Sequence, residues 1–160
     1  MNKFVVGVDG SEGSAAALAW AVRAAATCGA EVEAVYAWEL SYAWIDGYFP
    51  DLERWLGETE RAAGAALDAA VDGCLTPEFD QVKVTRHVRQ GQAATVLLRE
   101  AEGADLLVVG SRGRGELAAL VLGSVSHQCA QHAEVPIVLV PRPRGTRHES
   151  PRVRSETGAE

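Results

Sequence analysis

The residues with the clearest chemical potential are glycines and serines in the last third of the chain. Gly110, Gly113 and Gly115 follow an apolar run at 106–109, and the tetrapeptide Gly-Ser-Val-Ser occupies 123–126. Glycine lets the backbone turn and approach a ligand without a Cβ atom in the way. The tetrapeptide is typical of a helix start, where free N–H groups and hydroxyls attract anions. Together they predict an anion site, and phosphate is the usual anion.

A second candidate site follows the first apolar run, at 4–8. Asp9-Gly10-Ser11 forms a predicted turn, and either Asp9 or Ser11 can cap the next helix. Gly7 inside the run indicates that another group passes close to its backbone. Ligands of open α/β sheets bind beyond the carboxyl ends of the strands. If the runs at 4–8 and 106–109 are neighbouring strands, the two sites converge on one crevice.

The hydrophobic periodicity predicts the elements that position these sites. Apolar runs predict strands at 4–8, 31–38, 106–109 and 136–140, and alternation predicts a half-exposed edge strand at 81–88. Three-or-four spacing and glycine or serine boundaries predict helices at 12–27, 51–75, 91–102 and 124–133. The helix at 51–75 carries an apolar face from Leu52 and Trp55 to Cys74, so that face is expected to be buried. Strands alternating with helices indicate a parallel α/β sheet with helices on both faces.

Composition narrows the class of protein further. The chain has 160 residues, enough for one domain with its own core, and a net charge of −7. That charge argues against a nucleic-acid or membrane-surface binder. Without a signal peptide or an apolar stretch near 18 residues, no membrane span is predicted. Cys28, Cys74 and Cys129 form no CxxC pair, so reduced, buried thiols and a cytoplasmic location are expected.

The glycine spacing resembles that of the universal stress proteins of the ATP-binding kind, whose hallmark is Gly-x2-Gly-x9-Gly-(Ser/Thr). Here Gly110 and Gly113 are followed after nine residues by Gly123-Ser124. The resemblance extends to Val-Gly-Val-Asp-Gly-Ser at 6–11, to Gly91 and to Val-Pro-Ile-Val-Leu-Val-Pro at 135–141. It therefore covers nearly everything from Lys3 to Pro141.

The resemblance implies a fold, a ligand and an assembly. The fold would be a Rossmann-like three-layer α/β sandwich, similar to the adenine nucleotide alpha hydrolases, with strand order 3-2-1-4-5. It implies one domain at 1–141, and composition predicts a disordered, arginine-containing tail at 142–160. The ligand would be ATP with Mg²⁺, bound by a regulatory stress-response protein with at most weak ATP hydrolysis. A homodimer would form through the last strand, Ile137 to Val140, which is short, apolar and terminal.

The same resemblance assigns the nucleotide-binding residues by position. Asp9 and Gly7 would line the adenine and ribose end, and the backbone of Ala37 would contact the base. The loop Gly110-Ser111-Arg112-Gly113 would follow the ribose and phosphates. Gly123, Ser124, Val125 and Ser126 would bind phosphate oxygens through N–H groups and hydroxyls. Arg112 and Arg114 could add positive charge, and Gly10, Ser11 and Gly115 complete the set.

Other interpretations compete with this one. Each glycine alone could be a turn, and Ser124 alone a helix cap. A dimeric interaction module with a vestigial pocket would use the aromatic loop around Trp44 and Tyr48, and an enzyme acting on a nucleotide is a third possibility.

Gly113-x-Gly115-x-x-Ala118 sits too far beyond its strand for a dinucleotide fingerprint, and no Walker Gly-Lys-(Ser/Thr) or adenylating Ser-Gly-Gly-x-Asp-Ser motif occurs. The four histidines show no metal-ligand spacing.

Overall fold

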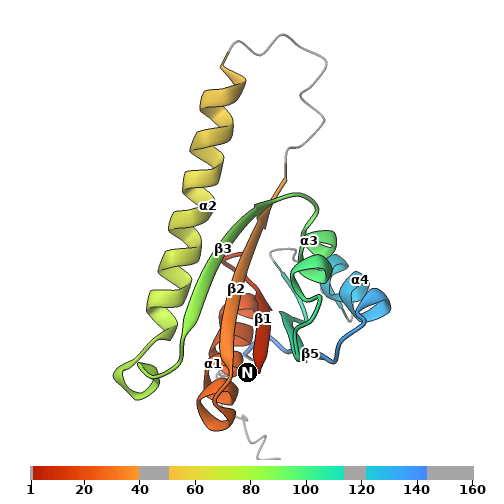
Figure 1. Cartoon of the computed structure of the whole chain (residues 1–160). Coiled ribbons are helices and arrows are strands. Elements are labelled where there is room, and N and C mark those ends of the chain that lie inside the picture. Colours follow the sequence, from red (N-terminus) through yellow and green to blue (C-terminus); the bar gives the residue numbers. More distant parts are fainter. Residues whose placement is uncertain (1, 40–50, 114–121, 144–160) are drawn as a thin grey trace, which may run out of the picture.

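The computed structural model describes residues 2–39, 51–113 and 122–143. Its described elements are β1 (Lys3–Gly7), α1 (Glu12–Cys28), β2 (Glu31–Trp38), α2 (Leu52–Cys74), the 3₁₀ turn η2 (Pro77–Phe79), β3 (Val84–Gln90), α3 (Ala93–Glu100), β4 (Leu106–Gly110), α4 (Ser124–His132) and β5 (Ile137–Val140). The strands form one parallel sheet in the order β3-β2-β1-β4-β5 (Figure 1). The predicted fold class and strand order are therefore confirmed.

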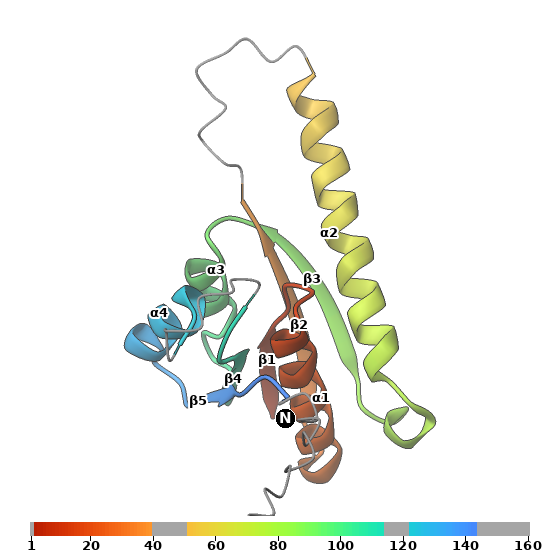
Figure 2. The same ribbon diagram turned by 180° about the vertical axis from the view of Figure 1, so that it is seen from behind.

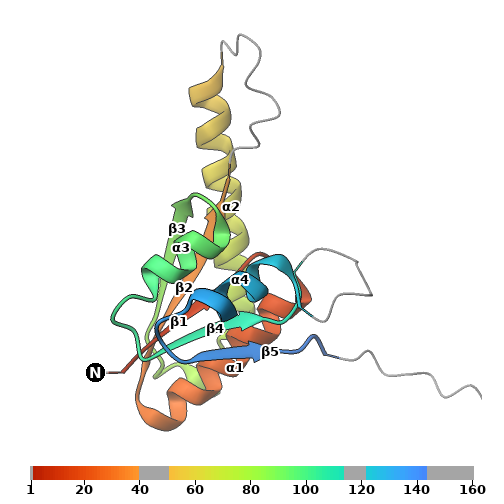
Figure 3. The ribbon, with the colours of Figure 1, turned by 90° about the vertical axis from the view of Figure 1, so that its right-hand side faces the viewer.

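Helices cover both faces of this sheet. Figure 3 shows the sheet face-on, with α3 and α4 in front of it and α1 behind it. Apolar side chains of α1 and α2, such as Leu18 and Leu67, form one core with one face of the sheet. Side chains of α3 and α4, such as Leu97 and Cys129, form a second core with the other face. The two cores bury β1 and β4 on both sides, which explains their continuous apolar runs.

The ends of α1 follow directly from its sequence. The Ser11 side chain accepts a hydrogen bond from the N–H of Ser14, 3.1 Å away, and caps the first turn. Gly29 adopts the left-handed conformation with φ 70° and ends the helix, as predicted. Because α1 begins at the carboxyl end of β1, this cap lies at the edge of the sheet where a ligand is expected.

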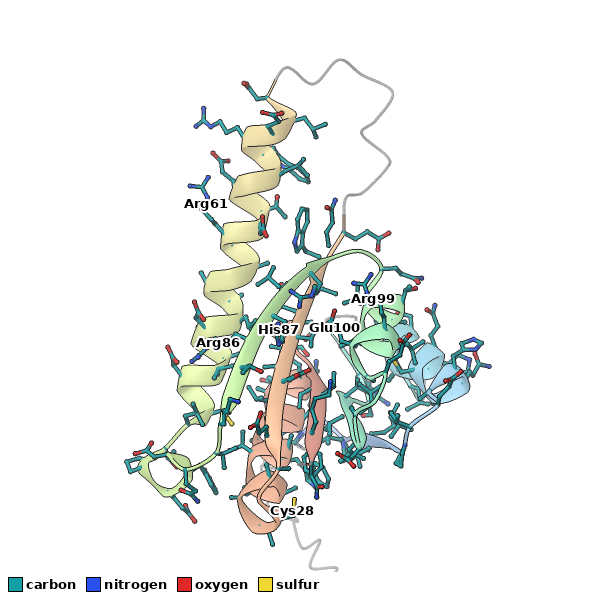
Figure 4. All side chains as sticks on the ribbon, in the orientation of Figure 1. Cys28, Arg61, Arg86, His87, Arg99 and Glu100 are labelled. Atoms are coloured by element: carbon teal, nitrogen blue, oxygen red, sulfur yellow. The ribbon has the colours of Figure 1, made fainter. Side chains whose placement is uncertain are left out.

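The edge strand begins later than its alternating pattern predicts. The predicted strand at 81–88 is observed as β3, at the edge of the sheet. Its first predicted residues instead form the turn after η2, where the N–H of Val82 donates to the Phe79 carbonyl at 2.9 Å. Side chains on opposite faces of β3 then hold different helices. Arg86 pairs with Asp72 of α2 at 2.6 Å, whereas Arg89 pairs with Glu100 of α3 at 3.0 Å. Figure 4 shows Arg86 directed toward α2 and the neighbouring His87 on the side of α3.

The buried face predicted for the whole of α2 is wrong for its first turn, and the next apolar residue, Leu56, is partly buried against the core. Leu52 and Trp55 are 45% and 44% exposed, and the buried residues of α2 begin at Ala63. Figures 1 and 2 show why: the start of α2 extends past the end of the sheet, where no strand lies beneath it. The predicted loop before it falls at 40–50, outside the described residues. No helix in the described ranges is long and apolar enough to cross a membrane.

Only one cysteine has the buried position predicted for all three. Cys129 lies on the inner face of α4, and burial raises the pKa of its thiol to about 11. Burial also raises the pKa of the half-buried Cys74, against the lowering effect of Arg23. Cys28 is exposed at the far end of α1, as Figure 4 shows. Cys28 is the last residue of α1 and is not on its buried face, which the spacing of the cysteines alone does not reveal.

Candidate functional site

Both candidate loops lie at the carboxyl edge of the sheet, on adjacent strands. β1 pairs with β4 in the register Val6↔Val108, so the turn after β1 and the loop after β4 leave the sheet side by side. The adjacency on which their convergence depends is therefore present. A cavity of about 310 Å³ lies between them. It is lined by these residues of the predicted set: Gly7, Asp9, Ser11, Ala37, Gly110, Arg112, Gly113, Gly123, Ser124, Val125 and Ser126.

Two of the predicted residues that the structure describes, Gly10 and Ser111, are not part of this lining. Gly10 lies in the turn after β1 with φ 80°, a conformation that favours glycine, so it shapes the turn. Ser111 supports the loop through its backbone: its N–H donates to the Val140 carbonyl at 2.7 Å, and its carbonyl accepts from the N–H of Gly123 at 2.8 Å. Arg114 and Gly115 lie outside the described residues.

The turn carrying Asp9 is held by a local hydrogen-bond network. Asp9 Oδ1 accepts from the N–H of Ser11 at 2.9 Å, and the N–H of Asp9 donates to Ser14 Oγ at 3.3 Å. Ser14 Oγ in turn donates to the Ser11 carbonyl at 2.9 Å. Asp9 is thus part of a rigid turn, and it is also the one acidic residue among the described residues that line the cavity. The sequence singled out Asp9 and Ser11 but missed the buried Ser14.

The glycines of the loop are needed for packing against protein as well as for access to a ligand. A Cβ atom on Gly110 would lie 2.7 Å from the carbonyl carbon of Gly13, in the first turn of α1. A Cβ atom on Gly13 would in turn meet the Arg112 carbonyl oxygen. Among the loop glycines, Gly110, Gly113 and Gly123 all have ordinary φ values. Close packing of α1 on the loop, not a left-handed backbone, therefore explains Gly110, and the sequence interpretation missed Gly13.

The start of α4 forms the other wall. Gly123 occupies the cap position, and the first helical hydrogen bond runs from the His127 N–H to its carbonyl, at 2.9 Å. The N–H groups of Ser124, Val125 and Ser126 therefore belong to the first turn, where a helix lacks internal acceptors. The buried Ser126 hydroxyl lies 2.9 Å from both the Ser111 and the Gly123 carbonyl oxygens. In this arrangement the hydroxyl supports the loop, and its donation to phosphate stays a prediction.

The opposite end of the cavity is apolar and comes from β2 and α3. Val35, Ala93 and Leu97 line it, and none of them was predicted. Leu97 is the group that passes close to Gly7: a Cβ atom there would lie 2.8 Å from Leu97 Cδ1. The close approach predicted from Gly7 is therefore confirmed. The inward position of Leu97 in the helical pattern was visible in the sequence, but its proximity to Gly7 depends on the strand order.

The backbone N–H and C=O groups of Ala37, on β2, face this apolar end of the cavity. On β2, Val32 and Trp38 hydrogen-bond toward β3, whereas the Val35 carbonyl accepts from the N–H of Val8. Because alternate residues of a parallel strand bond to opposite neighbours, the N–H and C=O of Ala37 face the side of β1. β1 ends at Gly7, opposite Val35, so β2 continues past its neighbour there. Ala37 therefore presents one donor and one acceptor at the cavity.

Comparison with known proteins places this arrangement in a family. The model of the universal stress protein family matches residues 1–141. The chain belongs to the universal stress protein family. A universal stress protein of Mycolicibacterium smegmatis is 38% identical over 141 residues, covering 88% of this chain and 45% of the relative. One from Mycobacterium tuberculosis is 34% identical over 139 residues, covering 84% and 43%. This universal stress protein chain thus spans about half the length of the curated relatives it matches.

Solved structures agree with the fold of this universal stress protein. A universal stress protein from Lactobacillus plantarum has a TM-score of 0.73 at 22% identity and covers 87% of this chain and 97% of its own. A universal stress protein in complex with cAMP has a TM-score of 0.55 at 27% identity, covering 88% and 97%. The predicted family is therefore confirmed.

Proposed function

We propose that this universal stress protein binds ATP and acts as a regulatory component of a stress response. One observation supports this most strongly. One end of the cavity has apolar walls and the backbone N–H and C=O of Ala37. The other end has the backbone N–H groups of 124–126, at the start of α4. A nucleotide needs both kinds of surface, one for its base and one for its phosphates. The cAMP complex of a relative supports a nucleotide as the class of ligand.

The base end suits adenine. The Ala37 carbonyl would accept from the exocyclic amino group, and the Ala37 N–H would donate to the neighbouring ring nitrogen. Val35 and Leu97 would pack against the faces of the base. The hydrogen-bonding groups of a base lie at its edges, so apolar contact with its faces leaves none of them unpaired. Guanine has the opposite order of donor and acceptor at these two positions. Because the ribose and phosphates fix the orientation of the base, guanine cannot turn over to match Ala37. We therefore expect adenine nucleotides to bind more tightly than guanine nucleotides.

The phosphate end would use backbone donors and one arginine. The N–H groups at the start of α4 and the helix dipole favour negative charge. Arg112 lines the same end and adds a charged group. Mg²⁺ is bound mainly by phosphate oxygens, water and one or two carboxylates. Asp9 is the acid among the described lining residues, and its Oδ2 atom lies beside Gly113, so we place it near the phosphates and not at the adenine and ribose end that the resemblance implies. Bound Mg²⁺ would supply charge neutralisation of the phosphates.

We propose a binding protein that hydrolyses ATP slowly at most. A fast hydrolase needs a general base aligned with the attacking water. No histidine lies among the described residues lining the cavity, and the Asp9 Oδ1 atom already accepts from the Ser11 N–H. A cytoplasmic location, where ATP is abundant, fits this role and is part of the proposal.

The direct test is whether the protein carries nucleotide. We expect heat-denatured, freshly purified protein to release ATP or ADP, detectable by anion-exchange chromatography. Nucleotide-free protein should then bind ATP more tightly than GTP in a competition assay with a fluorescent ATP analogue. Equal displacement by the two nucleotides would contradict the role of Ala37. An apo protein that captures one specific protein partner would instead favour the interaction module, whose predicted residues Trp44 and Tyr48 lie outside the described residues.

We further propose that two copies pair through β5. This strand is at the edge of the sheet, and Ile137, Val138 and Leu139 are partly exposed. Val140 bonds toward β4, so the alternate residues Ile137 and Leu139 direct their backbone groups to the free edge. Leu139→Pro removes one of those donors and should convert the dimer to a monomer in sedimentation velocity. A wild-type protein that sediments as a monomer at high micromolar concentration would contradict the dimer.

A further inference from the structure

Arg142, outside the predicted domain, contacts the glycine loop that lines the phosphate end of the cavity. It lies two residues beyond β5, at the sheet edge where the loop after β4 emerges. Its Nη2 atom donates to the Gly113 carbonyl oxygen at 3.5 Å, and its Nε atom lies 3.7 Å from Glu12 Oε2 in the first turn of α1. The side chain therefore links the end of β5, the glycine loop and the start of α1.

Gly113 is the residue at which the parts of the phosphate end meet. A Cβ atom on Gly113 would lie 2.9 Å from Asp9 Oδ2, and one on Gly123 would lie 3.4 Å from the Gly113 N atom. A displacement of Gly113 would therefore alter the spacing between the Asp9 turn and the start of α4. The Ala37 end would be unaffected, because β2 and α3 form it.

The geometry points to Arg142 as a positioning residue for the phosphate groups of the ligand. This inference rests on the proposed ATP binding. By holding the Gly113 carbonyl, the guanidinium keeps the loop at the distance from α4 that a polyphosphate chain requires. Arg142 is 44% exposed and its contacts use two of its five donors, so its charge also contributes to the positive potential beside the cavity, together with Arg112. Both effects act on phosphates and not on the base.

If Arg142 acts on the phosphates, its replacement should affect the binding of ligands that carry phosphates and spare those that do not. Replacing Arg142 with alanine should weaken ATP binding by about twofold to fivefold, the range expected for losing one partly exposed charged interaction. Adenosine, which lacks phosphates, should bind Arg142→Ala as tightly as it binds the wild type. Arg142→Lys should fall between the two for ATP, because lysine keeps the charge but cannot hold both oxygens with a planar fork.

The experiment measures ATP and adenosine affinities by calorimetry in nucleotide-free full-length protein, with thermal unfolding recorded for each variant. Arg99→Ala is the matched control, because Arg99 also makes an ion pair of 3.7 Å, with Glu100, but that partner does not line the cavity, whereas Arg142 contacts the lining residue Gly113. It should leave both affinities unchanged. Unchanged ATP affinity in Arg142→Ala, or equal losses for ATP and adenosine, would overturn the inference while leaving ATP binding intact. A wild type that binds no ATP would overturn both proposals.

Discussion

Alanine in place of Gly110 is expected to lower the free energy of unfolding by about 1–3 kcal/mol, the usual cost of overpacking. Its Cβ atom would lie 2.7 Å and 2.8 Å from the carbonyl carbon and oxygen of Gly13, and 3.1 Å from the Ser14 N atom. These are backbone atoms of α1, so no rotamer change relieves the overlap and α1 must shift from the sheet. Urea unfolding measures the change.

A matched substitution separates this effect from a general cost of adding a methyl group. Gly73 lies in α2, and a Cβ atom there meets nothing within 4 Å. Gly73→Ala should leave stability unchanged or raise it by up to about 1 kcal/mol, because alanine favours helix. If Gly110→Ala proved as stable as the wild type, the close packing of α1 on the loop would be wrong. Gly13→Ala should reproduce the loss, since its methyl group meets the Arg112 carbonyl oxygen.

Valine in place of Gly123 is expected to abolish ATP binding, with a loss of about a hundredfold or more in affinity, while the fold persists. The backbone angles of Gly123, φ −70° and ψ 163°, are ones that valine adopts readily. A Cβ atom would be in van der Waals contact with Gly113 N at 3.4 Å and Arg112 Cα at 3.5 Å. The Cβ atom would also lie 3.5 Å from Ser126 Oγ in the first turn of α4, so we expect the two Cγ atoms of valine to occupy space beside that turn. They would keep a phosphate from two or three N–H groups, each a charge-assisted hydrogen bond.

Stability and affinity must be measured on the same preparations for this variant. The free energy of unfolding should stay within about 1 kcal/mol of the wild type, as for most substitutions at partly exposed, unstrained positions. Gly123→Ala, which lacks the Cγ atoms, should lose less ATP affinity than Gly123→Val. Full ATP affinity in a folded Gly123→Val protein would mean that phosphates do not approach the start of α4.

Hydrophobic periodicity was sufficient to predict the strands and helices, because buried parallel strands and helices with apolar faces leave clear patterns. It failed for the start of α2, where Leu52 and Trp55 continue the pattern beyond the end of the sheet. Strand pairing determines where a sheet ends, and the sequence of one helix does not show where the strands beside it end. The strand order is implied by the resemblance to a family, since hydrophobic periodicity predicts the strands but not which of them pair.

The candidate site was predictable where a residue type has a local reason. Ser11 caps a helix and Gly10 forms a turn, and both functions depend on adjacent residues. Gly13 and Arg142 were missed because their partners are distant in sequence: Gly13 packs on the loop after β4, and Arg142 contacts Gly113 and Glu12. Composition alone assigns Arg142 to the tail.

Calorimetric titration of ATP with Mg²⁺ into nucleotide-free protein tests the central claim most directly. We predict saturable binding with one ATP per chain, and its absence in Gly123→Val measured under the same conditions. No heat at millimolar ATP, from folded protein that also releases no nucleotide on denaturation, would contradict ATP binding by this cavity.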